Sequence, residues 1–201
     1  NKFEKISWTE SYKKIVEKIS STTPEKIAGI TGDMTNMETL FSIKEFFEKI
    51  IKSKNLDSRS NDYYVNSSER KNYIFNSNIE GLEESDLIIL VGTNPRLEAT
   101  ILNSRIRKTY LKNKTTIYSI GDVGDLTYPY TVLENNTKVI KEIVSNKHSV
   151  SNKIINAKKP AIIIGESVLK LNSSVYIFEE LKKYLLENNK INNEWNSLNI
   201  L

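Results

Sequence analysis

The residues best suited to bind a ligand form the turn Gly92-Thr93-Asn94-Pro95-Arg96, which follows an apolar run and precedes a predicted helix. In an α/β protein, a turn at the carboxyl end of a strand is where phosphate groups bind, because the helix start offers free N–H groups. Arg96, Arg105 and Arg107 would add cations for an anion or for a protein partner.

The same residues also fit a turn that needs no ligand. Gly92 permits a positive φ or a close backbone approach. Thr93 or Asn94 can cap the following helix, and Pro95 stands at the first helical position, where its missing N–H costs nothing. Judged by spacing alone, the ligand-free interpretation is favoured.

The other strand-end turns carry acidic residues. Gly32 is followed by Asp33, Gly121 by Asp122, and Gly165 by Glu166, which places a carboxylate where a phosphate would need backbone N–H groups. Neither a G-x-G-x-x-G pattern nor a P-loop pattern is present. The sequence therefore argues against a dinucleotide or nucleoside triphosphate site.

The composition excludes several chemistries within this chain. Among 201 residues there is no cysteine, so disulfides, thiolate nucleophiles and cysteine-ligated iron–sulfur clusters are excluded. The single histidine, His148, is expected at the surface near a helix end. Charges of both signs are interleaved, with a net charge of +4, which indicates no nucleic-acid partner. No apolar run is long enough to cross a bilayer, so no direct membrane insertion is expected.

Apolar runs alternate with amphipathic stretches, which predicts an α/β fold with a doubly wound, mostly parallel sheet and helices on both faces. Each run is continuous rather than alternating, as in strands that are covered on both sides. The expected strands are residues 26–31, 86–91, 115–120 and 160–165, with a shorter one at 56–59.

Helices are expected between the strands. Ser7 is a plausible N-cap for the first, with Glu10 three residues later to complete a capping box. Residues 61–81 are polar and are expected to form a loop with one or two short helical turns. The strand at 86–91 should lie at the centre of the sheet, with Leu102 and Ile106 packed on it. The expected helices span residues 8–19, 34–51, 95–111, 137–145, 150–157 and 174–187.

Four stretches together resemble a known family. Gly92 to Lys108 contains the pattern G-T-N-P-R, then E-A, then L-N-x-R-I-R-K, and residues 121–130 contain D-L-T-Y-P-Y. Residues 6–15 resemble a W-x-E-A helix start, and residues 194–201 resemble a W-N-G-F-N-V-L segment. These motifs, in this order, resemble the molybdopterin-oxidoreductase-like domain of the large iron–sulfur subunit (the 75-kDa type, also called the G type) of respiratory complex I, NADH:ubiquinone oxidoreductase.

The resemblance implies a structural, non-catalytic module that supports electron transfer from NADH to quinone in the peripheral arm, with no activity of this chain alone. It covers nearly the whole chain as a single, apparently incomplete domain, residues 1–201, while the family's cluster-binding N-terminal part is absent. No cofactor, catalytic or metal site is then expected here, since the family's iron–sulfur clusters lie in the missing part. The turn from Gly92 to Arg96 becomes a relic of cofactor binding, kept for packing.

The implied partners are other peripheral-arm subunits, including the cluster-bearing part of the same subunit. The implied location is the matrix side of the mitochondrial inner membrane, or the cytoplasmic face in a bacterium. A small-molecule or nucleotide-binding α/β enzyme, using Asp122, Asp125 and Arg96 at the sheet edge, is the alternative.

A candidate interface lies after the motif. Arg105, Arg107 and Lys108 place three cations within four positions, which requires facing carboxylates from this chain or from a partner. We expect an Arg–Asp network with Asp122 and Asp125, whose outer side contacts a neighbouring subunit. Tyr128 and Tyr130 flank Pro129 and would supply rigid contact area. An ordinary solvated helix face is the competing interpretation.

Overall fold

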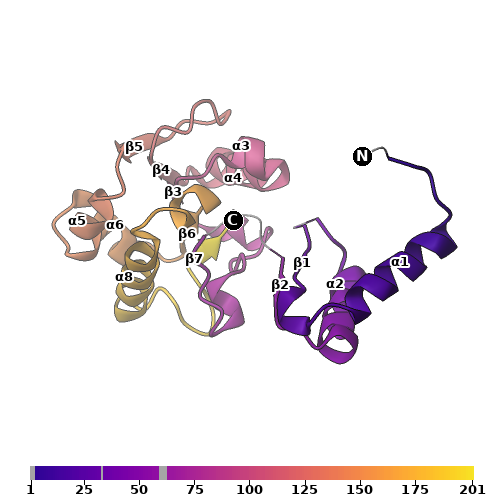
Figure 1. The fold of residues 1–201 in the computed structure, drawn as a ribbon. Helices are drawn as coiled ribbons and strands as arrows, with labels where there is room; N and C mark the ends of the chain where they lie inside the picture. Colours follow the sequence, from indigo (N-terminus) through magenta and orange to yellow (C-terminus); the bar gives the residue numbers. More distant parts are fainter. Residues whose placement is uncertain (1–2, 33, 59–62) are drawn as a thin grey trace. The chain divides into compact units, whose positions relative to one another are not determined.

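The computed structural model describes residues 3–32, 34–58 and 63–201, and the chain divides into two compact units, Asn1–Asp62 and Tyr63–Leu201 (Figure 1). Asp33 and Arg59, to which the sequence assigned a turn and a strand end, lie outside the described residues, as does the start of the predicted 61–81 loop.

The second unit contains a five-stranded parallel sheet in the order β5-β4-β3-β6-β7. The strand predicted to be central is central: β3 pairs with β4 on one side and with β6 on the other. All five of its residues are buried, as expected for a continuous apolar run. The strands are β3 (Leu87–Val91), β4 (Thr116–Ile120), β5 (Thr131–Glu134), β6 (Pro160–Ile164) and β7 (Leu198–Ile200).

Helices cover both faces of this sheet, which confirms the doubly wound α/β fold. Ile88 and Leu90 of β3 face one core cluster, which includes Leu102 and Ile106 of α4 (Thr100–Asn113). Both helix residues are buried, as predicted. The alternate side chains of β3 face a second cluster, built with α5 (Val139–Val144), α6 (Ser149–Asn156) and α8 (Ser174–Glu187).

The predicted helices of this unit agree with the structure to within about two residues at either end, with one exception. The helix predicted at 95–111 is two helices, α3 (Pro95–Glu98) and α4, separated at Ala99. Ala99 leaves the helical region, with φ −150° and ψ 73°. His148 caps α6 through Nδ1, which accepts from Val150 N, so it lies at a helix end as expected.

The remaining elements of the second unit are short. The polar stretch after Tyr63 contains η3 (Arg70–Asn72) and is followed by η4 (Gly81–Glu84), in agreement with the predicted loop and helical turns. The sequence did not predict β5 or β7, nor the short α7 (Glu166–Leu169) that follows β6.

The first unit is smaller and contains little buried surface. Its first helix, α1 (Trp8–Ser20), begins as predicted, with Ser7 Oγ accepting from Glu10 N at 3.2 Å. The other elements are η1 (Pro24–Lys26), β1 (Gly29–Ile30), α2 (Met37–Glu45), the π-helical turn η2 (Phe46–Ile51) and β2 (Leu56–Asp57). Strands β1 and β2 pair in parallel.

Two predictions for this unit are wrong. The run 26–31 forms no buried strand: only Gly29 and Ile30 are in β1, and Ile30 is 76% exposed because β1 has one two-residue neighbour and no covering layer over this side chain. The helix predicted at 34–51 begins at Met37, because the side chain of Asn36 accepts from Thr39 N at 2.8 Å and caps it there.

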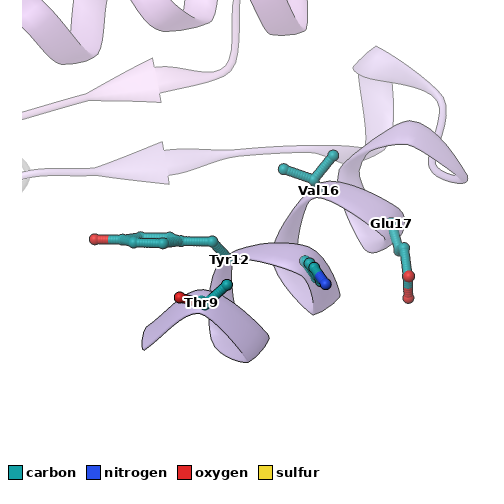
Figure 2. A pocket seen from close by; sticks show the side chains of 5 residues that line it. Thr9, Tyr12, Val16 and Glu17 are labelled. Atoms are coloured by element: carbon teal, nitrogen blue, oxygen red, sulfur yellow. The ribbon is translucent and has the colours of Figure 1, made fainter. Parts of the chain in front are cut away.

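The apolar side of α1 is exposed. None of its residues is buried, and Trp8 stacks on Tyr12 with ring centroids 5.7 Å apart. A shallow depression on the helix is lined by Thr9, Tyr12, Lys13, Val16 and Glu17 (Figure 2). Amphipathic spacing therefore predicted the helix correctly, but it did not show what packs against it.

Candidate functional site

The turn after β3 is a capped helix start. Gly92 has φ +58°, and a Cβ at this position would lie 2.4 Å from Cγ2 of Val168, so glycine is required both by conformation and by space. Asn94 is the N-cap of α3: its Oδ1 accepts from Arg96 N at 3.0 Å and from Leu97 N at 3.2 Å. Pro95 occupies the first helical position, as the spacing predicted.

Glu98 completes this turn, and the sequence pattern did not identify it. One carboxylate oxygen accepts from Asn94 N at 2.9 Å, and the other accepts from the Thr93 hydroxyl at 2.7 Å. The signal for this contact was present, since an acidic residue one turn after a cap is typical of a side chain that reaches back. The N–H groups of residues 94, 96 and 97 thus all donate to the side chains of Asn94 and Glu98, and Pro95 has no N–H group. A phosphate at this turn would therefore compete with the chain's own acceptors.

The turns after β3 and β6 lie where a doubly wound sheet would bind a ligand. The connections from β3 to β4 and from β5 to β6 lead to opposite sides of β3, so the sheet order reverses between these two turns. The turns are in direct contact: a Cβ on Gly165 would lie 2.6 Å from both Gly92 O and Thr93 Cβ. Ser167 Oγ donates to Gly92 O, and Thr93 is only 1% exposed. The chain's own atoms fill this crevice.

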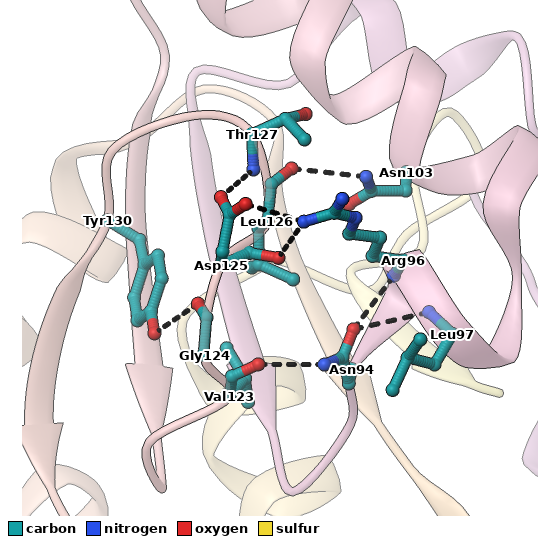
Figure 3. A network of polar contacts seen from close by, with 10 residues as sticks. All are labelled: Asn94, Arg96, Leu97, Asn103, Val123, Gly124, Asp125, Leu126, Thr127 and Tyr130. Carbon is teal, nitrogen blue, oxygen red and sulfur yellow. Dashed lines mark hydrogen bonds and ion pairs between the residues drawn. The ribbon is translucent and has the colours of Figure 1, made fainter.

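The same turn is joined to the loop between β4 and β5 (Figure 3). Asn94 Nδ2 donates to Val123 O at 2.7 Å, so one amide caps α3 with its oxygen and holds the loop with its nitrogen. Arg96 Nη1 donates to Asp125 O at 3.0 Å and to Asp125 Oδ2 at 2.6 Å. The two motifs G-T-N-P-R and D-L-T-Y-P-Y, about thirty residues apart in sequence, therefore form one polar network.

A buried part of this network lies beneath α4. Asn103 Nδ2 donates to Leu126 O at 3.2 Å, and the Tyr128 hydroxyl donates to Asn103 Oδ1 at 2.7 Å. Tyr128 is only 7% exposed, and desolvation raises the pKa of its hydroxyl far above the ordinary value. The expectation that Tyr128 offers contact area to a partner is therefore wrong, because this ring is packed in the chain's own core.

Asp125 folds its loop locally as well as binding Arg96. Its Oδ1 accepts from Thr127 N at 2.8 Å, and Thr127 adopts a positive φ of 71°, which β-branched residues rarely do. The Thr127 N–H, and next the Arg96 guanidinium, hold the pKa of the Asp125 carboxyl below its ordinary value. An ionised carboxylate thus stabilises a strained turn.

Asp122 acts in a similar way at the start of the loop. Its Oδ1 accepts from Gly124 N at 3.0 Å and lies 3.1 Å from the Tyr130 hydroxyl, which is 2.8 Å from Gly124 O. The Gly124 N–H, and next the Tyr130 hydroxyl, lower the pKa of Asp122. The Tyr130 side chain remains partly exposed to solvent.

Of the two acidic turns that the structure describes, the one at Glu166 agrees with the sequence expectation and the one at Asp122 does not. Asp122 follows β4 but precedes a loop and the strand β5, so it does not lie at a helix start. Glu166 is the first residue of α7 and pairs with Lys170 at 2.7 Å. Within residues 3–32, 34–58 and 63–201, no group of three or more His, Cys, Asp or Glu could hold a metal ion. No helix in this part of the chain is long and apolar enough to cross a membrane.

The cations of α4 pair with a different carboxylate from the one predicted. Arg105 and Lys108 both bind Glu83 of η4, with Lys108 Nζ 2.8 Å from its carboxylate. These two side chains lie along η4, whereas Asp125 lies beside the start of α3, so the predicted network of Arg105 and Arg107 with Asp122 and Asp125 is wrong. Lys108, and next Arg105, lower the pKa of Glu83. Arg107 is exposed and has no carboxylate within 4.0 Å in the described part of the chain.

Comparison with known proteins gives a consistent result. The profile of the molybdopterin oxidoreductase family matches residues 1–201. Over 200 residues, covering 100% of this chain, the chain is 31% identical to the mitochondrial NADH dehydrogenase (ubiquinone) iron–sulfur protein 1 of Solanum tuberosum. Over 200 residues it is also 34% identical to the G-type subunit of the NADH-quinone oxidoreductase of Rickettsia prowazekii, again covering 100% of this chain. It is 32% identical over 212 residues to the 75 kDa subunit of the NADH-ubiquinone oxidoreductase of Reclinomonas americana, covering 99% of this chain. The chain spans only 27% to 31% of the length of these relatives.

Proposed function

The chain belongs to the molybdopterin oxidoreductase family, and from that premise we propose that it is a structural, non-catalytic part of the large iron–sulfur subunit of NADH:ubiquinone oxidoreductase, complex I. The relatives bear the names of that subunit in mitochondria and in bacteria. In this proposal the chain supports electron transfer from NADH to quinone without carrying electrons itself, and it has no activity alone.

The cofactor in the family name does not fit the residues present. A molybdopterin nucleotide would need free N–H donors at the strand-end turns, but those of residues 94, 96 and 97 are bound by Asn94 and Glu98. The crevice between the turns after β3 and β6 is filled by Gly92 O and Thr93. The sequence also contains no cysteine thiolate for a metal. We therefore assign no reaction step to this cofactor.

The observation that carries the proposal is the set of contacts that the turn from Gly92 to Arg96 makes with the rest of the chain. Asn94 and Arg96, which could face an anion, instead hold the loop after β4 through Val123 O and Asp125. A turn whose capping amide, N–H groups at residues 94, 96 and 97, and arginine bind its own chain supports packing rather than ligand binding. This same observation disfavours the alternative, a small-molecule or nucleotide-binding enzyme that uses the strand-end turns.

The proposed partners are subunits of the peripheral arm, including the part of the same subunit that bears the iron–sulfur clusters. The proposed location is the matrix side of the mitochondrial inner membrane, or the cytoplasmic face in a bacterium, with no nucleic-acid partner and no membrane insertion. That residues 1–201 act as one domain, although they form two compact units, also remains a proposal.

Copurification tests the proposal. An affinity-tagged chain, isolated from its source in mild detergent, should carry respiratory subunits in fixed ratio, together with NADH:quinone activity that depends on them. Isolation of the chain without such subunits would refute the proposal. Calorimetric titration of the isolated chain with ATP and with NADH tests the alternative: saturable binding would favour an enzyme, and we expect no heat of binding.

A further inference from the structure

The solvent-facing side of α4 carries aliphatic residues where charged ones would be usual. The buried side of the helix consists of Leu102, Asn103, Ile106 and Thr109. On the opposite side, Ile101 is 66% exposed and Leu111 is 55% exposed. Leu97, at the start of this helix pair, is 79% exposed. The outer side of a surface helix is normally polar, so these side chains need an explanation.

Cations lie between and beside these aliphatic residues. Ser104, Arg107, Lys108, Leu111 and Lys112 line a shallow depression along the helix. Lys108 shares Glu83 with Arg105, so one carboxylate serves two cations. Neither Arg107 nor Lys112 has a carboxylate within 4.0 Å among the residues that the structure describes. The outer side of α4 therefore has an uncompensated positive charge beside exposed aliphatic side chains.

We propose that this α4 outer face, defined by Ile101, Ser104, Arg107, Lys108, Leu111 and Lys112, docks a protein segment that carries aspartate or glutamate beside aliphatic side chains. This inference rests on the proposed function and names the chemistry of one partner. Ile101 and Leu111 are ten residues apart, about 15 Å along the helix, which suits two anchoring contacts of one segment. Arg107, which lies between these two residues, and Lys112, which follows Leu111, complement carboxylates and fix which segments are accepted.

A protein segment fits this face better than a nucleic acid does. Phosphate backbones bind through many cations, and base recognition uses aromatic or hydrogen-bonding side chains. The α4 outer face offers few cations and, instead, aliphatic residues that a sugar–phosphate chain would leave uncovered. A partly apolar interface rimmed by charge is typical of protein contacts.

Site-specific photo-crosslinking in the assembled complex tests the proposal. A benzoylphenylalanine residue is placed at Ile101 or at Leu111, and as a control at Val175, which is 51% exposed on α8. We expect crosslinks from Ile101 and Leu111 to a peptide rich in Asp, Glu and aliphatic residues, and not from Val175. Crosslinks no more frequent than at Val175, crosslinks to basic peptides, or crosslinks that nuclease removes would overturn it. If the chain without benzoylphenylalanine also fails to enter any complex, the proposed function is refuted instead.

Charge reversal gives an independent test. Arg107→Glu brings like charges together at the docking face, so we expect the affinity for the complex, measured by reassembly at low salt, to fall by about tenfold. Arg107→Lys should restore most of it. Lys141→Glu, on the exposed side of α5 across the sheet, is the matched control and should assemble normally. Equal assembly of Arg107→Glu and Lys141→Glu would overturn the proposal.

Discussion

At the level of single residues, the turn from Gly92 to Glu98 is determined by hydrogen bonds that its own side chains make. The sequence predicted a cap at Thr93 or Asn94, of which the structure has Asn94, and the positions of Gly92 and Pro95, because these depend on local backbone geometry. It did not predict that Asn94 and Arg96 bind a loop about thirty residues away. Such partners depend on the tertiary fold, which spacing within one turn does not report.

Removing the Glu98 carboxylate should destabilise the fold. Glu98→Ala leaves Asn94 N and the largely buried Thr93 hydroxyl without their acceptor, and an unsatisfied buried donor costs about 1–3 kcal/mol. Urea unfolding of both proteins measures this difference. The control is Glu142→Ala on the exposed side of α5, which should change stability by less than roughly half a kcal/mol. Equal effects for both variants would show that the contact contributes nothing.

The loop carboxylates predict a dependence of stability on pH. The pKa values of Asp122 and Asp125 are lowered in the folded chain, so each contributes stability above the ordinary value of 3.8. This contribution is lost as pH falls from about 3.8 through the lower folded-state pKa. Asp125→Asn should therefore show a shallower acid-induced loss of stability than the parent, measured by thermal unfolding between about pH 6 and pH 2. Parallel pH profiles would contradict this.

At the level of elements, continuous apolar runs predicted β3, β4 and β6 well, because these strands are covered on both faces. The edge strands β5 and β7 were missed: β5 is largely exposed, and the middle of β7 is Asn199, whose amide bonds Ser77. The run 26–31, by contrast, was wrongly predicted to be a buried strand. An apolar run indicates a tendency to be covered, but it does not show that a covering layer exists in the same unit.

The two sides of α4 predict unequal effects of truncation. Leu102→Ala removes a side chain packed between α4 and the sheet, so we expect a loss of about 2–5 kcal/mol in unfolding free energy. Ile101→Ala changes the neighbouring, exposed aliphatic residue and should cost less than roughly half a kcal/mol. Denaturant unfolding of the two variants measures both. If Ile101→Ala were as damaging as Leu102→Ala, the face of the helix would be wrongly assigned.

At the level of the whole molecule, the two units differ in how much core they contain. Both core clusters consist of residues from the second unit, on either face of its sheet. In the described residues of the first unit, only Phe47 and Ile51 are buried apolar side chains, and α1 has no buried residue. Units of about 60 residues are marginal even with a good core, and a single helix of this length is marginal in water.

Separating the two units should therefore give opposite results. Residues 63–201 expressed alone should unfold in one cooperative transition, because every residue of both clusters is retained. Residues 1–62 expressed alone should show little helical signal by circular dichroism and no cooperative melt, since α1 has no buried residue and this unit has few buried apolar side chains. The intact chain, melted under the same conditions, is the reference. A cooperative melt of residues 1–62 alone would show that this unit carries its own core, and a non-cooperative melt of residues 63–201 would show that the sheet depends on it.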